Sequence, residues 1–426
     1  MSSSSFDIIV IGGGMSARHA AEDAVKCGWK VAHCMGNPFM EFPMGACIFL
    51  NDPEQHQKFF CGNPEKFKLK GVTYVFDVVT DVDADRKVVR FQSGLSALSY
   101  KALIVATGSK LPLFSPRLGD GVAARVAEVK AAAAAIKQAE TVVVNGAGAV
   151  GVEMVGDIRA KHPHVNITLL SRTGGVVQDS TSDVQRRVMD ALRGMRVKVV
   201  KGSAPADCME PKLEPGTVMI SNGEVQELRY DVFIPAFAQG PNTDFLQSSG
   251  TLNEKGQIVA NECLQSTARP EIFGVNVTTQ PLLGHPVSSR VTAQARTCAA
   301  NAKLLLEGKA PKPHVDKEGP PVMKAPMNIK IGHGPGGYLI WQDLGPARFL
   351  CFQPCGGGFP FCPPPCCWCC ASGCATCLGN CCGPAEGEGA ARLMEGFLLP
   401  KFMAPHGYLG AGELPPKMQK MKGAME

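Results

Sequence analysis

A valine-rich strand followed by a glycine-rich turn is the feature that most limits what this chain can fold into. Residues 141–153 read TVVVNGAGAVGVE, which places Gly146, Gly148 and Gly151 at the G-x-G-x-x-G spacing. The valines favour a short buried strand, and the glycines allow a tight turn, the close approach of a pyrophosphate and close helix packing. Free N–H groups at the start of the helix attract phosphate. The stretch predicts a dinucleotide site, with a purely structural turn as the alternative.

The residues after this turn complete a βαβ unit. We expect a helix over 150–159, a break at 161–163 and a second parallel strand over 165–170. Ser171 and Arg172 follow that strand. An acidic residue at this point would accept a hydrogen bond from a ribose 2′-hydroxyl, whereas an arginine would pair with a 2′-phosphate. We therefore expect NADPH rather than NADH, with a solvated surface arginine as the alternative.

A second glycine motif lies near the N-terminus. A strand that starts at Phe6 leads into the motif residues Gly12, Gly13, Gly14 and Ala17. Gly12, Gly14 and Ala17 have the related G-x-G-x-x-A spacing. A helix over 17–26 and a strand over 30–34 complete the unit, so the chain contains two nucleotide-binding units about 130 residues apart.

The region between the two units is mostly strand. Residues 72–76 and 87–91 are rich in β-branched residues and predict antiparallel strands around turns at 81–85. A buried strand over 103–109 ends in small residues, and a comparable strand over 231–240 closes the second unit.

Two helices are expected outside these units. The alanine run 131–135 has high helix propensity. Residues 288–307 predict a long amphipathic helix, for which we expect core packing. Its apolar face is formed by Val291, Ala295, Cys298, Ala302 and Leu305.

Composition excludes several classes of protein. A length of 426 residues predicts two or three domains, and 45% hydrophobic with 19% charged residues is ordinary for a globular chain. The net charge of +5 is not gathered into a basic run, so we expect no nucleic-acid partner. No apolar run is long enough to predict a membrane-spanning helix. Residues 1–5 lead directly into a strand, so we expect no signal peptide.

The cysteines are unevenly distributed. Of 18 cysteines, seven are scattered and eleven lie between Cys351 and Cys382. Several C-x-x-C pairs in this tail suit zinc or an iron–sulfur cluster, although no histidine lies among them. Disulfides, acylation with membrane binding, and a loose tail that contacts a partner are the other interpretations. Residues 391–403 form an apolar segment with basic residues at both ends, which suits a membrane surface or a protein partner.

The two glycine turns, the strand end at Ala106, Thr107 and Gly108, and the stretch from Gly146 to Glu153 together resemble the pyridine nucleotide-disulfide oxidoreductase superfamily. Within it, the chain is most similar to apoptosis-inducing-factor-like flavoproteins and type II NADH dehydrogenases. The resemblance covers about residues 6–345, including a weak similarity at 327–332. It implies an α/β fold with two Rossmann-like, doubly wound nucleotide-binding domains and a C-terminal cysteine-rich extension. The implied limits are 1–115 with 241–313 for the FAD domain, 116–240 for the NAD(P)H domain, and 314–426 for the C-terminal region with its tail at 351–382.

The resemblance also implies the cofactors and their sites. The first turn would hold the FAD pyrophosphate, Thr107 and Gly108 would lie on the flavin side, and the second turn would hold NAD(P)H. Cys47 and Cys61 are too far apart for the C-x-x-x-x-C pair of disulfide reductases, so we expect no dithiol relay. The resemblance implies a quinone-like or another small electron acceptor. No residue is singled out as a general acid or base. The expected cofactor-binding residues are Gly12, Gly13, Gly14, Ala17, Ala106, Thr107, Gly108, Asn276, Gly146, Gly148, Gly151, Glu153, Ser171 and Arg172.

Three departures from the family pattern keep other functions open. The acidic residue expected after the second FAD strand is replaced by Cys34 or its neighbours His33 and Met35. The glycine–aspartate pair expected near the flavin is replaced by a stretch that contains Asn276, and residues 39–44 are largely apolar. The second hypothesis is therefore a degenerate relative retained as an accessory subunit of a membrane complex. The third is a redox or metal sensor that works through the tail. In the first two cases we expect an intracellular protein, peripheral on an organellar or cytoplasmic membrane.

Overall fold

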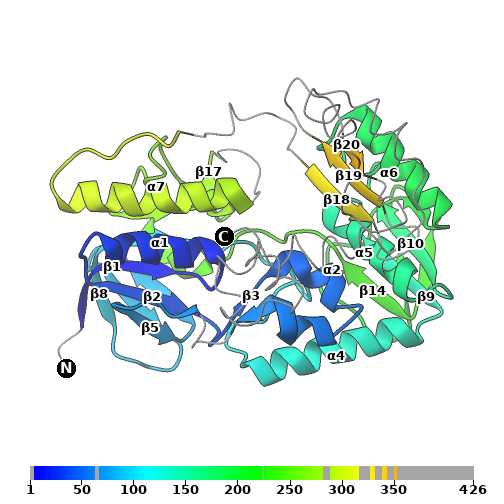
Figure 1. Cartoon of the computed structure of the whole chain (residues 1–426), viewed down its shortest axis with the longest axis horizontal. Helices are drawn as coiled ribbons and strands as arrows, with labels where there is room; N and C mark the ends of the chain where they lie inside the picture. The colour runs from blue at the N-terminus through cyan, green and yellow to red at the C-terminus, as the bar shows by residue number, and fades with distance from the viewer. Residues whose placement is uncertain are drawn as a thin grey trace, which may run out of the picture.

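The computed structural model describes residues 4–62, 67–223, 225–281, 288–315, 327–331, 338–342 and 350–352. A mainly parallel sheet and an all-parallel sheet, with helices packed on them, form the body of the molecule and lie side by side (Figure 1). The α/β fold with two Rossmann-like nucleotide domains is confirmed. The expected domain limits stay a prediction, and the interpretations of the cysteine tail beyond residue 352 fall outside the described residues.

The first sheet has seven strands, and those at its centre are parallel. In order, the strands are β5 (Val72–Phe76), β2 (Val31–Met35), β1 (Ser5–Ile11), β8 (Leu98–Val105), β7 (Val88–Phe91) and β6 (Val79–Asp83), with β16 (Ile272–Gly274) also paired to β8. The strand β1 has β2 on one side and β8 on the other. In open α/β sheets, nucleotides bind at the carboxyl ends of two adjacent parallel strands whose following connections lead to opposite sides of the sheet.

Two expectations for this sheet are wrong. The strand over 72–76 is not antiparallel but pairs with β2 in parallel, because residues 36–71 form a connection long enough to bring the chain back to the same end of the sheet. The turn expected at 81–85 is shorter, because Asp81 and Asp83 belong to β6 and the turn covers 84–87. The antiparallel pairing of β7 is as expected.

Helices α1 (Met15–Lys26) and α7 (Ser288–Leu306) cover one face of the first sheet, with α7 stacked on α1 (Figure 1). The buried face of α1 consists mainly of alanines, whose small side chains let the helix lie close to the strands. The core face expected for the long helix is confirmed, because Ala295, Cys298 and Ala302 are buried in the same cluster as the alanines of α1.

The second sheet has four parallel strands. In order they are β11 (Lys198–Lys201), β10 (Asn166–Ser171), β9 (Thr141–Asn145) and β14 (Val232–Pro235). Its helices are α4 (Val122–Gln138), α5 (Ala149–Lys161) and α6 (Ser182–Gly194). The helix α5 ends where the sequence predicts, because Pro163 cannot continue the hydrogen-bonding pattern.

Shorter elements connect or flank the two sheets. Between β2 and β5 lie β3 (Met40–Glu41), η1 (Pro43–Gly45), α2 (Ala46–Phe49), η2 (His56–Phe60) and β4 (Cys61–Gly62). Later in the chain come β12 (Gly216–Met219), β13 (Glu227–Tyr230), η3 (Asp244–Ser249), β15 (Ile258–Val259), η4 (Asn276–Thr278) and β17 (Thr279–Gln280). An antiparallel sheet of β18 (Met327–Ile331), β19 (Tyr338–Gln342) and β20 (Leu350–Phe352) lies near α5 and α6 (Figure 1).

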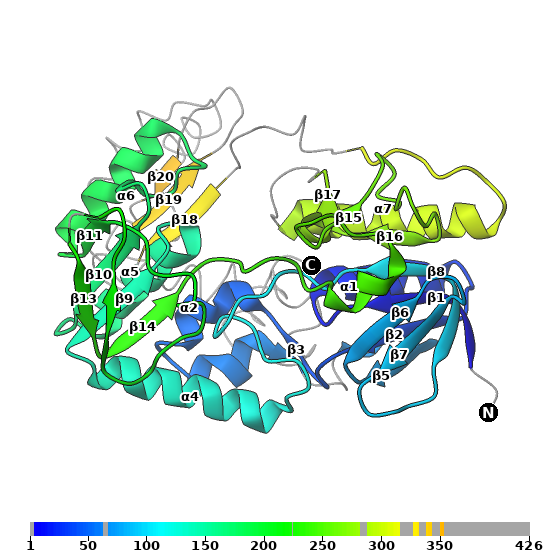
Figure 2. The same cartoon turned by 180° about the vertical axis from the view of Figure 1, so that it is seen from behind.

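Two connections between the sheets, one after β8 and one after β14, are paired with each other (Figure 2). Ser109 forms an antiparallel bridge with Pro241, and the main-chain N–H of Asn242 donates to the carbonyl of Gly108 at 2.9 Å. The short helix α2 packs against α5, where the Cys47 thiol donates to the Val150 carbonyl at 3.6 Å. The two halves are therefore held together by backbone pairing and by a shared core.

A buried ionic cluster also ties β3 to α4. The Arg125 guanidinium donates to both carboxylate oxygens of Glu41, each at 2.8 Å, and to Glu128 at 2.6 Å. His56 bonds the same Glu41 carboxylate at 2.6 Å. Arg125, Glu41 and His56 are almost fully buried. A buried charge is stable only when paired, so this cluster fixes the segment after β2 against the first helix of the second sheet.

We expect Arg125→Met to lower the free energy of unfolding by about 3–5 kcal/mol, because it leaves the Glu41 carboxylate buried without its guanidinium. Replacing both residues, Arg125→Met with Glu41→Leu, should lose less than the single change. Lys26→Met is the control, since it removes an exposed pair with Glu22. Urea denaturation followed by circular dichroism measures all three. A double variant less stable than Arg125→Met would contradict this account.

Candidate cofactor-binding site

The first glycine turn begins directly after β1, and its geometry requires glycine. Gly12 has a φ of +144°, and a Cβ atom there would lie 2.3 Å from the carbonyl oxygen of Ala106 and 3.2 Å from the Cβ of Ala17. Ala17 must therefore be small as well. Gly14 precedes the first residue of α1, and nothing lies within 4 Å of a Cβ built on it. The main chain here is open to close approach by a pyrophosphate, as the motif predicts.

Two residues of β2 hold this turn in place. The main-chain N–H of Gly12 donates to the Cys34 carbonyl at 2.9 Å, and Nε2 of His33 lies 2.7 Å from the Gly12 carbonyl oxygen. His33 is fully buried, and burial lowers its pKa to about 4, with the Arg18 guanidinium acting in the same direction. The neutral imidazole therefore donates from Nε2 to the turn.

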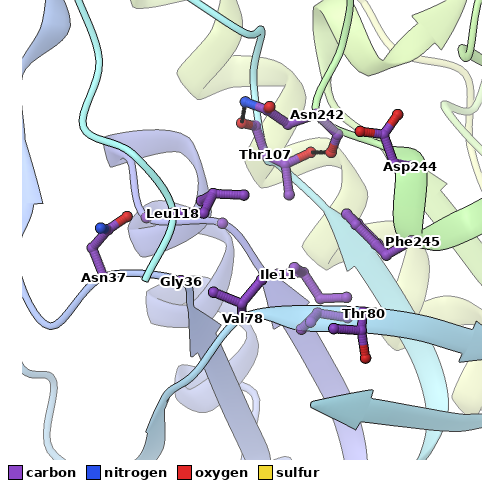
Figure 3. Close-up of a pocket in the computed structure, with 13 residues that line it drawn as sticks. Ile11, Gly36, Asn37, Val78, Thr80, Thr107, Leu118, Asn242, Asp244 and Phe245 are labelled. Carbon is purple, nitrogen blue, oxygen red and sulfur yellow. Dashed lines mark hydrogen bonds between the residues drawn. The ribbon is translucent and has the colours of Figure 1, made fainter. Parts of the chain in front are cut away.

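A cavity of about 320 Å³ opens at the carboxyl ends of β1, β2 and β8 (Figure 3). Its walls come from the turn after β1, the end of β2, the start of β6 and the paired connections. Thr107 lines it, and the hydroxyl of Thr107 donates to the Asn242 carbonyl at 2.5 Å while the Asn242 amide donates back to the Thr107 carbonyl at 3.2 Å. Both connections between the sheets thus form one wall of the cavity.

The other residues expected at the flavin end lie at the same edge of the sheet. Gly108 has a φ of +68°, which suits glycine, and follows β8. Asn276 follows β16, the parallel neighbour of β8, and is buried with a φ of +52°. The structure therefore brings Ala106, Thr107, Gly108 and Asn276 to one edge, and their contacts with a flavin stay a prediction.

The end of β2 differs from the expectation. The strand continues to Met35, and the methyl carbon of Met35 lies 3.9 Å from the position of a Cβ on Gly13. Met35 is therefore the residue of this strand end that lies beside the turn where an acidic residue was expected, whereas Cys34 is buried in the core and His33 binds the Gly12 carbonyl. Asn37, two residues further on, lines the cavity and was missed. Its sequence signal was weak, namely a polar side chain two residues after the end of a buried strand.

The apolar residues Phe39, Met40 and Phe42 are buried and are not among the residues that line this cavity. Met40 and Phe42 are buried in the core shared with the second sheet, and Glu41 is the carboxylate of the ionic cluster. Their apolar character therefore reflects packing between the two halves.

The second glycine turn repeats the first. Gly146 has a φ of +118°, and a Cβ there would lie 3.0 Å from the Ala236 carbonyl oxygen. A Cβ on Gly151 would lie 1.8 Å from the Gly146 carbonyl, whereas nothing lies within 4 Å of one on Gly148. Glu153 lies half-buried in α5. These glycines are placed as a dinucleotide site requires, and their roles in binding stay a prediction.

Two cations lie at the carboxyl edge of the second sheet. Arg172 is exposed directly after β10, and the Ser171 hydroxyl donates to the Gly175 carbonyl at 2.5 Å, which closes the turn beside it. Lys201 ends β11 opposite Ser171, and its side-chain carbons lie 3.4–3.6 Å from a Cβ built on Gly174. Lys201 was missed because only the pairing of β10 with β11 brings it to this loop.

The cysteines outside the tail form no disulfides. They are Cys27, Cys34, Cys47, Cys61, Cys208, Cys263 and Cys298. Burial raises the pKa of Cys61 to about 12, so its thiol is not activated. Among the described helices, none has the length and hydropathy needed to cross a bilayer.

We call the two glycine turns, at Gly12 and at Gly146, the glycine cradles. Together with the fold, they define a flavoprotein with two dinucleotide-binding domains. A family model described as pyridine nucleotide-disulphide oxidoreductase matches residues 6–279, and the chain belongs to this family, whose typical cofactors are FAD and NAD(P)H. The residues present fit both cofactors, because each turn has a glycine that no larger residue can replace and a main chain open to a pyrophosphate. The chain is thus a member of a family of NAD(P)H-dependent flavoprotein oxidoreductases.

The chain is similar to curated relatives in sequence and to a solved structure in fold. Oxidoreductase ptaL of Pestalotiopsis fici is 28% identical over 258 residues, which cover 59% of this chain and 66% of that protein. Ferroptosis suppressor protein 1 of Mus musculus is 34% identical over 205 residues, or 46% and 54% of the two chains. The match thus spans less than two thirds of either relative. The sulfide:quinone oxidoreductase of Aquifex aeolicus has a TM-score of 0.60 at 16% identity, covering 82% of this chain and 87% of that one.

We expect His33 to make stability depend on pH. The pKa is about 4 in the folded protein and 6.5 ordinarily, so the unfolded chain binds a proton first as pH falls. The stabilisation is complete above pH 6.5, is lost between 6.5 and 4, and amounts to about 3 kcal/mol. His33→Gln retains a donor for Gly12 but should flatten this part of the profile. Urea denaturation between pH 7.5 and 4 measures the difference.

The difference between wild type and variant isolates His33. His19 and His162, whose pKa values burial also lowers, are present in both proteins. Parallel profiles for the two proteins would show that His33 is not held neutral by the fold.

Proposed function

We propose that this chain is an FAD-dependent NAD(P)H oxidoreductase that delivers electrons to a quinone-like acceptor. The observation that carries the proposal is the pair of glycine cradles, at Gly12 and at Gly146, each at the carboxyl edge of its own parallel sheet. Bound FAD supplies the redox chemistry, since it accepts a hydride from NAD(P)H and releases electrons to an acceptor. The protein contributes binding, orientation and electrostatics.

Each cradle has a distinct task in this proposal. The turn after β1 binds the FAD pyrophosphate through its main-chain N–H groups and the N-terminus of α1. Thr107 and Asn242 hold the wall on the flavin side. The turn after β9 binds the pyrophosphate of NAD(P)H in the same manner. The paired connections and the ionic cluster keep the two cradles in a fixed relation.

A quinone-like acceptor is supported by two observations. Cys47 and Cys61 do not have the C-x-x-x-x-C spacing of the disulfide reductases, so we infer that no dithiol relays electrons. One solved structure of similar fold is named a sulfide:quinone oxidoreductase, and we take a quinone as the proposed acceptor from that name. We also propose that the C-terminal region, with its cysteine-rich tail and the segment 391–403, brings the protein to a membrane surface or to subunits of a membrane complex.

The second candidate function is an accessory subunit that has lost catalysis. One observation favours it, namely Met35 at the place of the family's acidic residue, because a thioether is a much weaker acceptor than a carboxylate. In that case the tail would attach the chain to a membrane complex.

The absorbance spectrum of the purified full-length protein decides between the two. We expect flavin bands that NADPH bleaches under anaerobic conditions and that a soluble quinone analogue restores. A protein that stays colourless after incubation with FAD and removal of the excess would contradict the enzyme and favour the accessory subunit. A flavin that NADPH reduces but quinone does not reoxidise would contradict only the acceptor.

We propose further that NADPH is the nucleotide, bound by Arg172 together with Lys201. Arg172→Glu and Lys201→Glu should each raise the Kd of adenosine 2′,5′-bisphosphate at least tenfold and change that of 5′-AMP less than twofold, because only the former carries the 2′-phosphate. Lys198→Glu is the matched control, since Lys198 is exposed at the other end of β11. Isothermal titration calorimetry measures these constants. Equal losses for both nucleotides would contradict the assignment.

A further inference from the structure

A short loop crosses the mouth of the first crevice beside the end of β2. We call residues Arg117–Asp120 the strap. The main-chain N–H of Gly119 donates to the Gly36 carbonyl at 2.9 Å. The side-chain amide of Asn37 donates to the carbonyls of Arg117 at 2.7 Å and of Asp120 at 2.9 Å. Three hydrogen bonds therefore fix the strap to the two residues that follow β2.

These bonds determine which atom Asn37 presents. An amide nitrogen has two hydrogens, and the strap carbonyls take both of them. The amide oxygen is then left as the acceptor of the side chain. Asn37 lines the cavity and is only 7% exposed, so this oxygen is held in one orientation. Met35, whose side chain lies beside Gly13 of the turn, has only a thioether sulfur, which is a weak hydrogen-bond acceptor.

Leu118 of the strap lies over the same end of the cavity (Figure 3). A Cβ atom on Gly36 would lie 2.8 Å from the Leu118 Cδ2 atom, so glycine at 36 gives the leucine room. Leu118 is 61% exposed although it is apolar. An exposed apolar side chain at the edge of a cavity suits the covering of a flat apolar group.

We propose that Asn37 replaces the family's acidic residue and binds the adenosine half of FAD. Its amide oxygen accepts a hydrogen bond from a hydroxyl of the adenosine ribose, and Leu118 covers the adenine. This inference rests on the proposed binding of FAD and concerns only this end of the crevice. The strap supplies the orientation, because it occupies both hydrogens of the amide.

The arrangement explains why an acidic residue is absent. Aspartate at position 37 would place a carboxylate oxygen close to the carbonyls of Arg117 and Asp120, where each pair of oxygens repels. The strap is also held from its other side, because Arg117 pairs with Glu128 at 3.3 Å and Glu128 binds Arg125. A strap fixed in this way requires a donor at 37, and asparagine supplies both the donor and an acceptor.

The test compares ligands that differ at the adenosine end. Apoprotein of the full chain is titrated with FAD, with FMN, which lacks adenosine, and with FAD whose adenosine ribose lacks its 2′- and 3′-hydroxyls. Flavin fluorescence reports each Kd. We expect Asn37→Ala and Asn37→Asp to raise the Kd for FAD at least tenfold and to leave that for FMN within twofold. Wild type should bind the deoxy analogue at least tenfold more weakly than it binds FAD. The Asn37→Ala variant should bind the deoxy analogue and FAD with about the same Kd.

Asn166→Ala is the control, because Asn166 is exposed at the start of β10, in the other sheet, and should leave every Kd unchanged. Equal losses of FAD and FMN in the Asn37 variants would overturn the inference, since they would show a general structural role. Deoxy FAD that binds wild type as tightly as FAD does, or Asn37→Asp that binds FAD more tightly than wild type, would overturn it too. Failure of wild type to bind FAD would instead overturn the proposed function.

Discussion

The close contact between a glycine and a carbonyl oxygen at the end of a neighbouring strand is the constraint on which both halves of this molecule depend. In the first half Gly12 lies against Ala106, which follows β8, and in the second half Gly146 lies against Ala236, which follows β14. In each case the contact joins the turn after β1 or β9 to the end of the adjacent strand, on the side opposite β2 in the first sheet and β10 in the second. This contact holds the turn at the topological switch point of the sheet, where its main-chain N–H groups are available to a bound pyrophosphate.

The two glycine turns share this backbone geometry but differ in the side chains near them. The first has neutral groups at the end of β2, with Met35 beside the turn and Asn37 held by the strap. The second has Arg172 and Lys201 at the ends of adjacent strands. A neutral polar acceptor suits a ribose with free hydroxyls, whereas two cations suit a phosphorylated one. The difference in charge supports two different nucleotides bound by one repeated scaffold.

The local sequence pattern was sufficient to predict those features of the fold that depend only on residues close together in the chain. Both βαβ units, the end of α5 before Pro163 and the core face of α7 follow from glycine spacing, proline and hydrophobic period. The direction of β5 could not be predicted this way, because it depends on the path of the long connection after β2. The same limit applied to the site. Lys201 reaches the loop after β10 only through strand pairing. The position of Asn37 in the cavity depends on the end of β2 at Met35, which the sequence did not fix.

The ionic cluster shows how the first crevice is linked to the second half of the molecule. Glu41 and Arg125 are 84 residues apart in sequence, and the same guanidinium also donates to the Leu113 carbonyl, just before the strap. Arg125 thus holds three elements at once: β3 through Glu41, α4 on which it lies, and, through the Leu113 carbonyl, the chain that leads into the strap. Movement of α4 relative to the first sheet would have to break buried charge pairs before it could displace the strap. The geometry of the adenosine end is therefore set by the packing between the halves as much as by the crevice itself.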